Sequence, residues 1–341
     1  MQSLQRISSR SRHLGCPRPT LIAVCRLSTQ APASPSTSLS RSYLYVPSSS
    51  DRMLEKSITA GSDVIIYDLE DSISPALEDK LAARARLRKF LETQQERLKS
   101  QHVAVRVNSI ATPFFRDDIS HIVSQSIVKS LILPKIHSHY DMDTVSEAVS
   151  VARKSFESGP LRLIPSIESA RAMFNLGSIA SWKSSHGPVA GGVLSALLFA
   201  AEDYCADTSI IRTSTRRELL YTRSQIVIAA KAFQLDAIDM VCVNYRDLST
   251  LEDECIDGRQ LGFNGKQAIH PSQVELINST FVPSPEEITR AAKILSAMEK
   301  AHGNQKGAVG LDGLMIDAPM IKQAQQIIDI AKNANLHIPR M

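Results

Sequence analysis

The stretch VIIYDLED at residues 64–71 decides the fold, because an apolar run passes directly into three acids. A second stretch, HVAVRVN at residues 102–108, ends similarly in an arginine and an asparagine. Four further apolar runs end in polar residues, at Pro134-Lys135, Ile167-Glu168-Ser169, Ala201-Glu202-Asp203-Tyr204 and Ile269-His270-Pro271. In a parallel barrel all strands point one way, so residues that end different strands meet on the face where loops build active sites. The sequence therefore predicts a barrel enzyme with a carboxylate-rich site that contains an arginine.

Short strand-like runs alternate with amphipathic helical stretches along the chain, which is the pattern of repeated βα units. Strands are expected at residues 43–47, 63–68, 102–107, 130–134, 162–167, 194–200, 237–243 and 265–269. Eight such units predict an α/β fold, a closed (β/α)8 TIM barrel. An open doubly wound sheet is the alternative, but the sequence lacks the GxGxxG turn expected after the first strand of a dinucleotide-binding fold. Helices are expected from Pro75 through Leu98 and from Ser284 through Lys300.

The first forty residues differ in composition from the rest. They contain five arginines and no acid, among many serines and threonines, as mitochondrial transit peptides do. A disordered basic tail is the alternative. Without this segment the formal net charge falls from +4 to −1, because five positive charges leave and no negative charge does. The basicity belongs to the leader, so nucleic-acid binding is not expected.

The C-terminal region is rich in glycine, with Gly303, Gly307, Gly310 and Gly313 before a helix expected from Pro319 to about Asn333. Closely spaced glycines leave the backbone free to change conformation, so this segment is either a linker or a lid that orders on binding. The expected organisation is a transit peptide at 1–40, a barrel at 41–300 and a glycine-rich lid with a C-terminal helix at 301–341.

The cysteines and the apolar runs exclude other classes of protein. Outside the leader there are three cysteines, Cys205, Cys242 and Cys255, without a CxxC pair, so neither a disulfide framework nor a zinc cluster is expected. The longest apolar stretch, residues 189–201, is too short to span a bilayer, and membrane insertion is not expected.

Glu168 and Asp203 each follow an almost wholly apolar strand. A carboxylate in that position needs a cation, a hydrogen-bond donor or water to avoid a large desolvation cost. A magnesium ion would satisfy both, because it takes one or two carboxylates and completes its octahedron with water and substrate oxygens. Structural salt bridges at the barrel mouth fit the same spacing equally well.

Arg106 alternates with Val105 and Val107, so its side chain is expected on the opposite face of the strand. A guanidinium directed into the barrel mouth can bind an anionic substrate and stabilise a developing enolate. It could instead pair with Glu70 or Asp71 to hold the barrel together, and the two roles can coexist.

Asp68, Glu70 and Asp71 place three acids in four positions. Alternation is expected to direct Asp68 and Glu70 to one side and Asp71 to the other, with Lys80 and Arg84 as partners on the next helix. Glu70 and Asp71 are therefore expected to support the site rather than to contact the substrate.

Other polar residues have two readings each. Arg52 and Lys56 lie four apart after Ser48-Ser49-Ser50, where they could hold phosphates or form a solvated basic face, which is more common. Asp317, before Ala318-Pro319, suits a helix cap better than a catalytic role. His270, before Pro271, fits a cap of the following turn, and Lys135 fits a salt bridge at the rim.

Several short motifs in a fixed order carry a resemblance to a known family. They are Tyr43-Leu44-Tyr45-Val46-Pro47, Asp68-Leu69-Glu70-Asp71, Lys80 with Ala83-Arg84, Val105-Arg106-Val107-Asn108, Leu133-Pro134-Lys135, Ile167-Glu168, Glu202-Asp203-Tyr204, Gly262-Phe263 with Gly265-Lys266, and Ile269-His270-Pro271. Over about residues 41 to 335 the chain resembles the citrate lyase beta-subunit-like family of the HpcH/HpaI-type aldolase superfamily. Relatives usually have glycine at position 200 or 201, or at both, and commonly at 48. Alanine at 200 and 201 would narrow the pocket.

The resemblance implies a magnesium-dependent carbon–carbon lyase of the mitochondrial matrix, usually homotrimeric. It would cleave citramalyl-CoA, or a related malyl-CoA-type thioester, to acetyl-CoA and pyruvate or glyoxylate. Residue by residue, it implies that Glu168 and Asp203 bind the metal, that Arg106 contacts the reacting oxygens, and that Asp317 of the same or a neighbouring subunit is the acid/base. The residues that would hold the CoA ester are Tyr45, Arg52, Lys56, Ile269 and His270. An acyl-CoA thioesterase using the same site and a non-catalytic acyl-CoA-binding subunit are the alternatives.

Overall fold

A computed structural model of the protein describes residues 39–153, 159–303, 309–311 and 314–341. The expected leader lies outside the described residues as far as residue 38. The strands are β1 (Ser42–Pro47), β2 (Val64–Asp68), β3 (His102–Arg106), β4 (Val128–Leu133), β5 (Arg162–Ile167), β6 (Val193–Leu194), β7 (Ala196–Phe199), β8 (Asp236–Asp239) and β9 (Gly265–Ala268). All are parallel, β1 pairs with β9, and β4 pairs with β5, so the sheet closes on itself. With β6 and β7 as one interrupted strand, the predicted (β/α)8 TIM barrel is confirmed.

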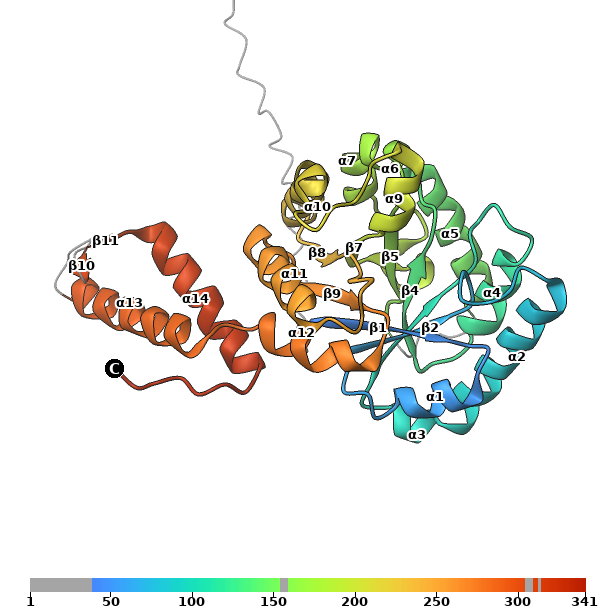
Figure 1. Cartoon of the computed structure of the whole chain (residues 1–341), viewed down its shortest axis with the longest axis horizontal. Coiled ribbons are helices and arrows are strands. Elements are labelled where there is room, and N and C mark those ends of the chain that lie inside the picture. Colours follow the sequence, from blue (N-terminus) through green and yellow to red (C-terminus); the bar gives the residue numbers. More distant parts are fainter. Residues whose placement is uncertain (1–38, 154–158, 304–308, 312–313) are drawn as a thin grey trace, which may run out of the picture. The chain divides into compact units, whose positions relative to one another are not determined.

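Helices surround the strands (Figure 1). They are α1 (Asp51–Ser57), α2 (Leu77–Thr93), α3 (Gln95–Leu98), α4 (Phe115–Ile122), α5 (His139–Ala152), α6 (Ala170–Phe174), α7 (Leu176–Ala180), α8 (Gly187–Gly191), α9 (Ala201–Thr208), α10 (Leu220–Ala232), α11 (Leu248–Leu261) and α12 (Val274–Thr280). The single helix expected from Pro75 to Leu98 is instead α2 and α3, because Gln94 leaves the helical conformation. No helix in the described residues is both long enough and apolar enough to cross a membrane.

Two apolar layers explain how the barrel aims its polar residues. The barrel interior holds a small cluster that includes Ile66, Ala104 and Ile164, whereas the alternating residues of the same strands pack outward against the helices. Burying one such aliphatic side chain contributes about 1.5–3 kcal/mol, so the alternation is strongly fixed. Asp68 and Arg106 lie two positions beyond Ile66 and Ala104, and Glu168 lies four positions beyond Ile164, so all three keep the same alternation. These polar side chains therefore emerge together at the C-terminal mouth of the barrel.

The sixth strand is interrupted where the sequence predicts a continuous run at 194–200. Arg162 of β5 is in register with Val193, whereas Ser166 is in register with Leu198, so the later strand has one extra residue. Ser195 is that bulge: its N–H donates to the carbonyl of Leu163. The bulge brings Phe199, at the end of β7, into register with Ile167 at the end of β5.

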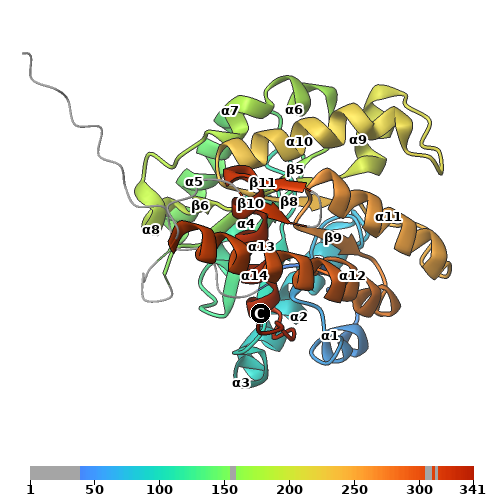
Figure 2. The ribbon, with the colours of Figure 1, turned by 90° about the vertical axis from the view of Figure 1, so that its left-hand side faces the viewer.

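The chain after the barrel forms a helical hairpin. Helices α13 (Pro285–Gly303) and α14 (Ala318–Asn333) run alongside each other (Figure 2) and share a separate apolar cluster that includes Ile288, Ile294 and Ile328. Between them, β10 (Val309–Leu311) and β11 (Leu314–Ile316) form an antiparallel pair. The glycine-rich segment thus contains strands that the sequence did not predict. Its role as a lid stays a prediction.

Candidate active site at the barrel mouth

Arg106 is the centre of an ionic cluster at the end of β3. Its Nε and Nη2 donate to the two carboxylate oxygens of Asp68, at 2.7 Å each. Its Nη1 lies 3.2 Å from Glu70 Oε2 and donates to Asp71 Oδ2 at 3.3 Å. The guanidinium also lies over the ring of Tyr45, with Cζ 4.9 Å from the ring centroid. Burial acts to raise the pKa of Asp68, but the bound guanidinium outweighs burial and holds that pKa below its ordinary value.

The three acids that follow β2 differ from the expected arrangement. All three contact Arg106, although alternation placed Asp71 on the other side. Strand β2 ends at Asp68, so the chain turns there and strict alternation no longer applies. Lys80 does not pair with the acid side chains either, because its Nζ donates to the carbonyls of Leu69 and Glu70.

The expected partnership of Arg84 with these acids is also wrong. Arg84 forms a buried ion pair with Asp118, at 2.7 Å between Nη2 and Oδ1. Asp118 lies on α4, the helix beside α2, so the pair joins two helices rather than supporting the barrel mouth.

Glu168 follows β5 and is almost completely buried. Its Oε2 accepts the backbone N–H of Lys135 at 3.2 Å, while the ammonium of Lys135 contacts Glu70 Oε1 at 3.0 Å. Lys135 has φ +55°, an uncommon conformation for a side-chain-bearing residue and one that recurs at functional sites. Burial, followed by repulsion from Asp203 and Glu70, raises the pKa of Glu168 to about 8.

Asp203 lies in the first turn of α9 and faces the same space. Burial, followed by repulsion from Asp71, raises its pKa above the ordinary value. Two neighbouring carboxylates that both resist ionisation mark a place where a cation would be stabilised.

These groups line one cavity of about 300 Å³. The sequence-predicted residues that line it are Tyr45, Arg106, Glu168, Asp203 and Ile269. Ala200 and Ala201 also line it, so the two methyl groups do occupy space beside Asp203. The cavity is large enough for a small organic acid, and its polar groups converge on one region.

Gln267 is a member of this site that sequence reasoning missed. From inside β9 it donates to the carbonyls of Phe199 and Asp239 at 2.9 Å each and accepts the hydroxyl of Tyr45 at 3.1 Å. It thus joins the ends of three strands. A single amide inside a four-residue strand was the available signal, because a buried polar side chain needs partners.

Four residues predicted to bind the substrate or to act in catalysis do not line the cavity. Arg52 and Lys56 are exposed on α1, and His270 is exposed, accepts the N–H of Ser272 and stacks on Tyr245. Asp317 caps α14, where its Oδ1 accepts the N–H of Met320 at 3.2 Å. His270 and Asp317 therefore both act as caps in the structure. The substrate-binding role of His270 and the catalytic role of Asp317 stay predictions.

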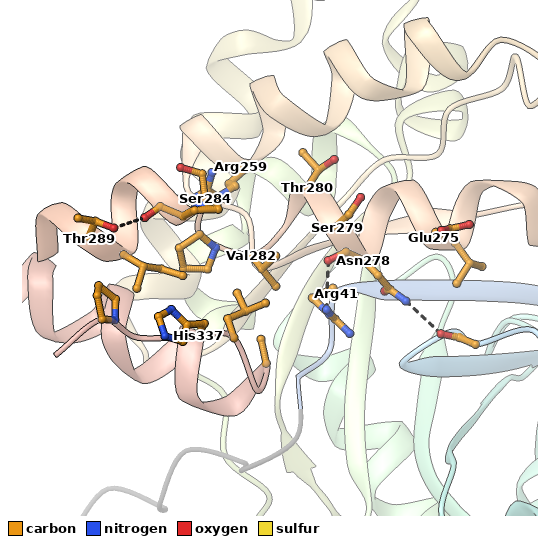
Figure 3. Close-up of a pocket in the computed structure, with 18 of the residues that line it drawn as sticks. Arg41, Arg259, Glu275, Asn278, Ser279, Thr280, Val282, Ser284, Thr289 and His337 are labelled. Atoms are coloured by element: carbon orange, nitrogen blue, oxygen red, sulfur yellow. Dashed lines mark hydrogen bonds between the residues drawn. The ribbon is translucent and has the colours of Figure 1, made fainter. Parts of the chain in front are cut away.

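A larger cavity, about 1040 Å³, lies beside α12 and the start of α13 (Figure 3). Its lining includes Arg41, which directly precedes β1. This larger cavity therefore adjoins the N-terminal end of β1, whereas the site described above lies at the C-terminal end of that strand, near Pro47. Arg41 is bound to Asp63 and to the carbonyl of Asn278, and Arg259 pairs with Glu287. None of the sequence-predicted site residues lines it. The chemistry therefore concentrates in the smaller cavity.

The donor set at the mouth fits a magnesium ion. Asp68 is neutralised by Arg106, but Glu168, which is buried, and Asp203, which is exposed, bring two further carboxylates that form no salt bridge among the described residues. In the part of the chain that the structure describes, no group of three or more histidine, cysteine or acidic side chains is arranged to hold a metal. Two carboxylates with room for substrate oxygens and water suit Mg²⁺, whereas a closed protein cage would suit other metals.

Magnesium binding should strengthen as the pH rises. A carboxylate must lose its proton to bind a metal, and the pKa of Glu168 is about 8, so binding below that pH releases a proton. We expect the dissociation constant for Mg²⁺ to fall by up to about tenfold per pH unit between pH 6 and 8 and to level off above it. Calorimetric titrations at several pH values check this, and an affinity that is constant from pH 6 to 9 would contradict it.

Comparisons with known proteins agree with this site. Residues 41–271 match the family described as HpcH/HpaI aldolase/citrate lyase. The chain is 33% identical over 293 residues to the mitochondrial citramalyl-CoA lyase of Homo sapiens, covering 85% of each chain. It is 32% identical over 288 residues to a (3S)-malyl-CoA thioesterase of Cereibacter sphaeroides, covering 84% of this chain and 93% of the relative.

A solved structure adds a comparison of folds. The protein CitE from Mycobacterium tuberculosis, in complex with magnesium, acetoacetate and coenzyme A, is similar with a TM-score of 0.68 at 27% identity, covering 88% of this chain and 99% of that one. The barrel, the converging polar residues and the match over 41–271 lead to one assignment. The chain belongs to the HpcH/HpaI aldolase/citrate lyase family of carbon–carbon lyases.

Proposed function

We propose that this protein is a magnesium-dependent lyase that cleaves citramalyl-CoA, or a related malyl-CoA-type thioester, to acetyl-CoA and pyruvate or glyoxylate. The observation that carries the proposal is the convergence of Arg106, Glu168 and Asp203 on one cavity of about 300 Å³. A guanidinium and a metal-binding carboxylate pair are the groups needed to hold a 2-hydroxy acid whose hydroxyl becomes a ketone. The name of the human relative and the ligands of the Mycobacterium structure support the substrate class.

The reaction moves one proton and breaks one carbon–carbon bond. The tertiary hydroxyl of citramalyl-CoA gives its proton to the carboxylate of Asp317, supplied by the C-terminal segment of the same or a neighbouring subunit, and its oxygen becomes the keto oxygen of pyruvate as the bond breaks. The electron pair of that bond moves onto the thioester, which becomes the enolate of acetyl-CoA. Return of the proton to the enolate carbon gives acetyl-CoA, so atoms and electrons balance without an oxidant. A bound magnesium ion supplies Lewis-acid stabilisation of the keto-acid oxygens.

Arg106 has one arm suited to the substrate. Its Nε and Nη2 are held by Asp68 at 2.7 Å, whereas Nη1 has, among the described residues, the longer contacts to Glu70 and Asp71, at 3.2 and 3.3 Å. We therefore assign Nη1 to the substrate oxygen that becomes negative, while Asp68 keeps the guanidinium in position. Glu70 and Asp71 contact this same nitrogen and would support it beside the substrate oxygen.

Product analysis tests this function against its alternatives. The purified protein is given citramalyl-CoA and malyl-CoA, with Mg²⁺ and with excess chelator. The proposal predicts acetyl-CoA with pyruvate or glyoxylate, formed only with Mg²⁺. Free citramalate or malate with CoA would indicate the thioesterase activity that the Cereibacter relative's name describes. Substrate binding without any product would indicate a binding subunit.

Arg52 and Lys56 are proposed to hold the phosphates of the CoA ester, because both are exposed cations on α1, which directly follows β1 at the barrel mouth. Contacts far from the breaking bond act equally on the ground state and the transition state. Replacing both residues by glutamine should therefore raise KM for the CoA ester and leave kcat nearly unchanged. A loss confined to kcat would contradict the placement. The exposed Lys89→Gln variant, on α2, is the control for lost surface charge.

We propose that residues 1–40 address the protein to the mitochondrial matrix and that the chain forms a homo-oligomer, with three copies. The arginine-rich, acid-free composition of the leader supports the address, and the human relative is named as mitochondrial. A fluorescent reporter fused to residues 1–40 should accumulate in mitochondria. Cytosolic fluorescence would contradict the address and would leave the lyase assignment unaffected.

A further inference from the structure

The first turn of α9 carries Asp203 but has no cap of its own. Ala200 occupies the N-cap position and has no side chain that could accept a hydrogen bond. Among the described residues, no side chain outside α9 hydrogen-bonds the carboxylate of Asp203. The direction in which Asp203 points therefore depends on what holds the backbone of this turn. The N–H of Ala200 ties the start of the turn to the carbonyl of Ile167 at 3.2 Å, and Glu202 adds a side-chain connection through its ion pair with Arg212.

Arg212 joins three elements of the barrel mouth through one guanidinium. Its Nη1 contacts Glu202 of α9, and its Nη2 donates to Glu254 Oε1 of α11 at 2.9 Å and to the carbonyl of Val241 at 3.1 Å. Val241 lies just after β8 and lines the cavity. The side chains of Arg212 and Glu254 are only 13% and 7% exposed, so solvent screens this contact weakly, whereas the contact to the half-exposed Glu202 is screened more.

The far side of this connection is fixed by buried charges. Glu254 Oε2 lies 3.0 Å from the ammonium of Lys266, which is fully buried on β9. Lys266 in turn lies 4.0 Å from Asp239, and Asp239 is held by Arg223 at 2.7 Å. Removing one partner from such a series leaves an uncompensated buried charge, which is costly. Glu254 is therefore a firm anchor for Arg212.

We infer that Arg212 is a positioning residue for the magnesium site: through Glu202 it fixes the first turn of α9 so that Asp203 faces Glu168. The inference rests on the proposed function, because it takes Asp203 and Glu168 as the residues that hold the ion. An arginine suits the role because its planar fork reaches two carboxylates at once, whereas a lysine ammonium is a single point of charge.

The test is the affinity of the full-length chain for Mg²⁺ alone, measured by calorimetric titration after treatment with a chelator. Arg212→Met should weaken Mg²⁺ binding by about 10- to 100-fold, the range seen when residues that orient metal ligands are removed. Arg212→Lys should fall between Arg212→Met and the parent protein. At saturating Mg²⁺ the kcat of both variants should approach the parental value. The bound ion then favours the conformation of the first turn of α9 in which Asp203 faces Glu168.

A matched control separates positioning from general stability. Arg216 forms ion pairs with Asp253 and Asp257 of α11, the helix that also carries Glu254, and within the described residues it forms no ion pair with α9. Arg216→Met should lower the melting temperature while leaving Mg²⁺ affinity within about twofold of the parent. If Arg216→Met weakened Mg²⁺ binding as much as Arg212→Met does, the inference would be overturned.

A second variant covers the case in which Arg212→Met fails to fold by circular dichroism. Glu202 is half-exposed, so Glu202→Gln breaks the same ion pair without leaving a buried charge on α9. It should weaken Mg²⁺ binding, and adding it to Arg212→Met, where that folds, should weaken binding no further. Unchanged affinity in Glu202→Gln, or fully additive losses, would overturn the inference. Asp203→Asn separates failure of the proposed metal site from failure of the role of Arg212. Unchanged Mg²⁺ affinity in Asp203→Asn would contradict the metal site itself. Weaker Mg²⁺ binding in Asp203→Asn but not in the Arg212 and Glu202 variants would contradict only the role of Arg212.

Discussion

Glu168→Gln should lower the rate of citramalyl-CoA cleavage by at least about 100-fold at ordinary Mg²⁺, and Asp203→Asn should do the same. Each change keeps the volume of the side chain and removes a negative charge from the proposed metal site. A metal ion that stabilises developing charge contributes several kcal/mol, and each 1.4 kcal/mol corresponds to a tenfold change in rate. Steady-state assays of acetyl-CoA formation measure the effect.

In the absence of metal, the same Glu168→Gln variant should have a free energy of unfolding at least as large as that of the parent protein. Burial and the repulsion from Asp203 raise the pKa of Glu168 to about 8, so keeping it ionised above that pH costs folding free energy. The neutral amide removes this cost, and the melting temperature at pH 9 should not fall. Glu147→Gln, an exposed change on α5, is the control and should alter neither quantity. Parental turnover in Glu168→Gln would remove the metal assignment.

Asp317→Asn should lower turnover by about 100-fold or more while leaving the chain folded, because an amide cannot exchange a proton at neutral pH. Asparagine caps helices about as well as aspartate, so the bond to the N–H of Met320 is kept and stability should hardly change. If Asp317 is only a cap, Asp317→Asn will turn over citramalyl-CoA at near the parental rate. Asp317→Ala would then cost about 0.5–2 kcal/mol of stability and little activity.

Asp247 offers a matched control for the capping role. It caps α11 by accepting the N–H groups of Ser249 and Thr250, and it lies outside the proposed catalytic machinery. Asp247→Asn should keep full activity. Mixing Asp317→Asn with Glu168→Gln then tests the assembly: activity regained in mixed oligomers would show that Asp317 of one subunit completes the site of another. No recovery would assign Asp317 to its own subunit.

The sequence predicted those parts of the structure that depend on local alternation. Residues two positions apart on a strand share a face, so Arg106 follows Ala104, and Glu168 follows Ile164 and Ser166, toward the barrel mouth. An apolar run that ends in a charge was sufficient to identify them. Beyond the end of β2 at Asp68 the alternation no longer applies, and there the same rule placed Asp71 on the wrong side.

The parts that the sequence did not predict depend on partners far along the chain. Gln267 bonds to Phe199 and Tyr45, and Arg212 joins Glu202 to Glu254, over separations that no periodic pattern reveals. The bulge at Ser195 is likewise decided by how the strand pairs with β5 and β8. In the sequence, charged residues between amphipathic stretches cannot be told from solvent-exposed residues. Only the folded structure shows which of them are buried.

A magnesium titration of the chelator-treated protein tests the central claim most directly, with bound metal and acetyl-CoA formation measured on the same samples. The account predicts that turnover of citramalyl-CoA rises in step with the binding of one Mg²⁺ per chain, and that Glu168→Gln shows neither at the same concentrations. Full turnover in the chelator-treated protein, or binding and turnover that survive in Glu168→Gln, would contradict it.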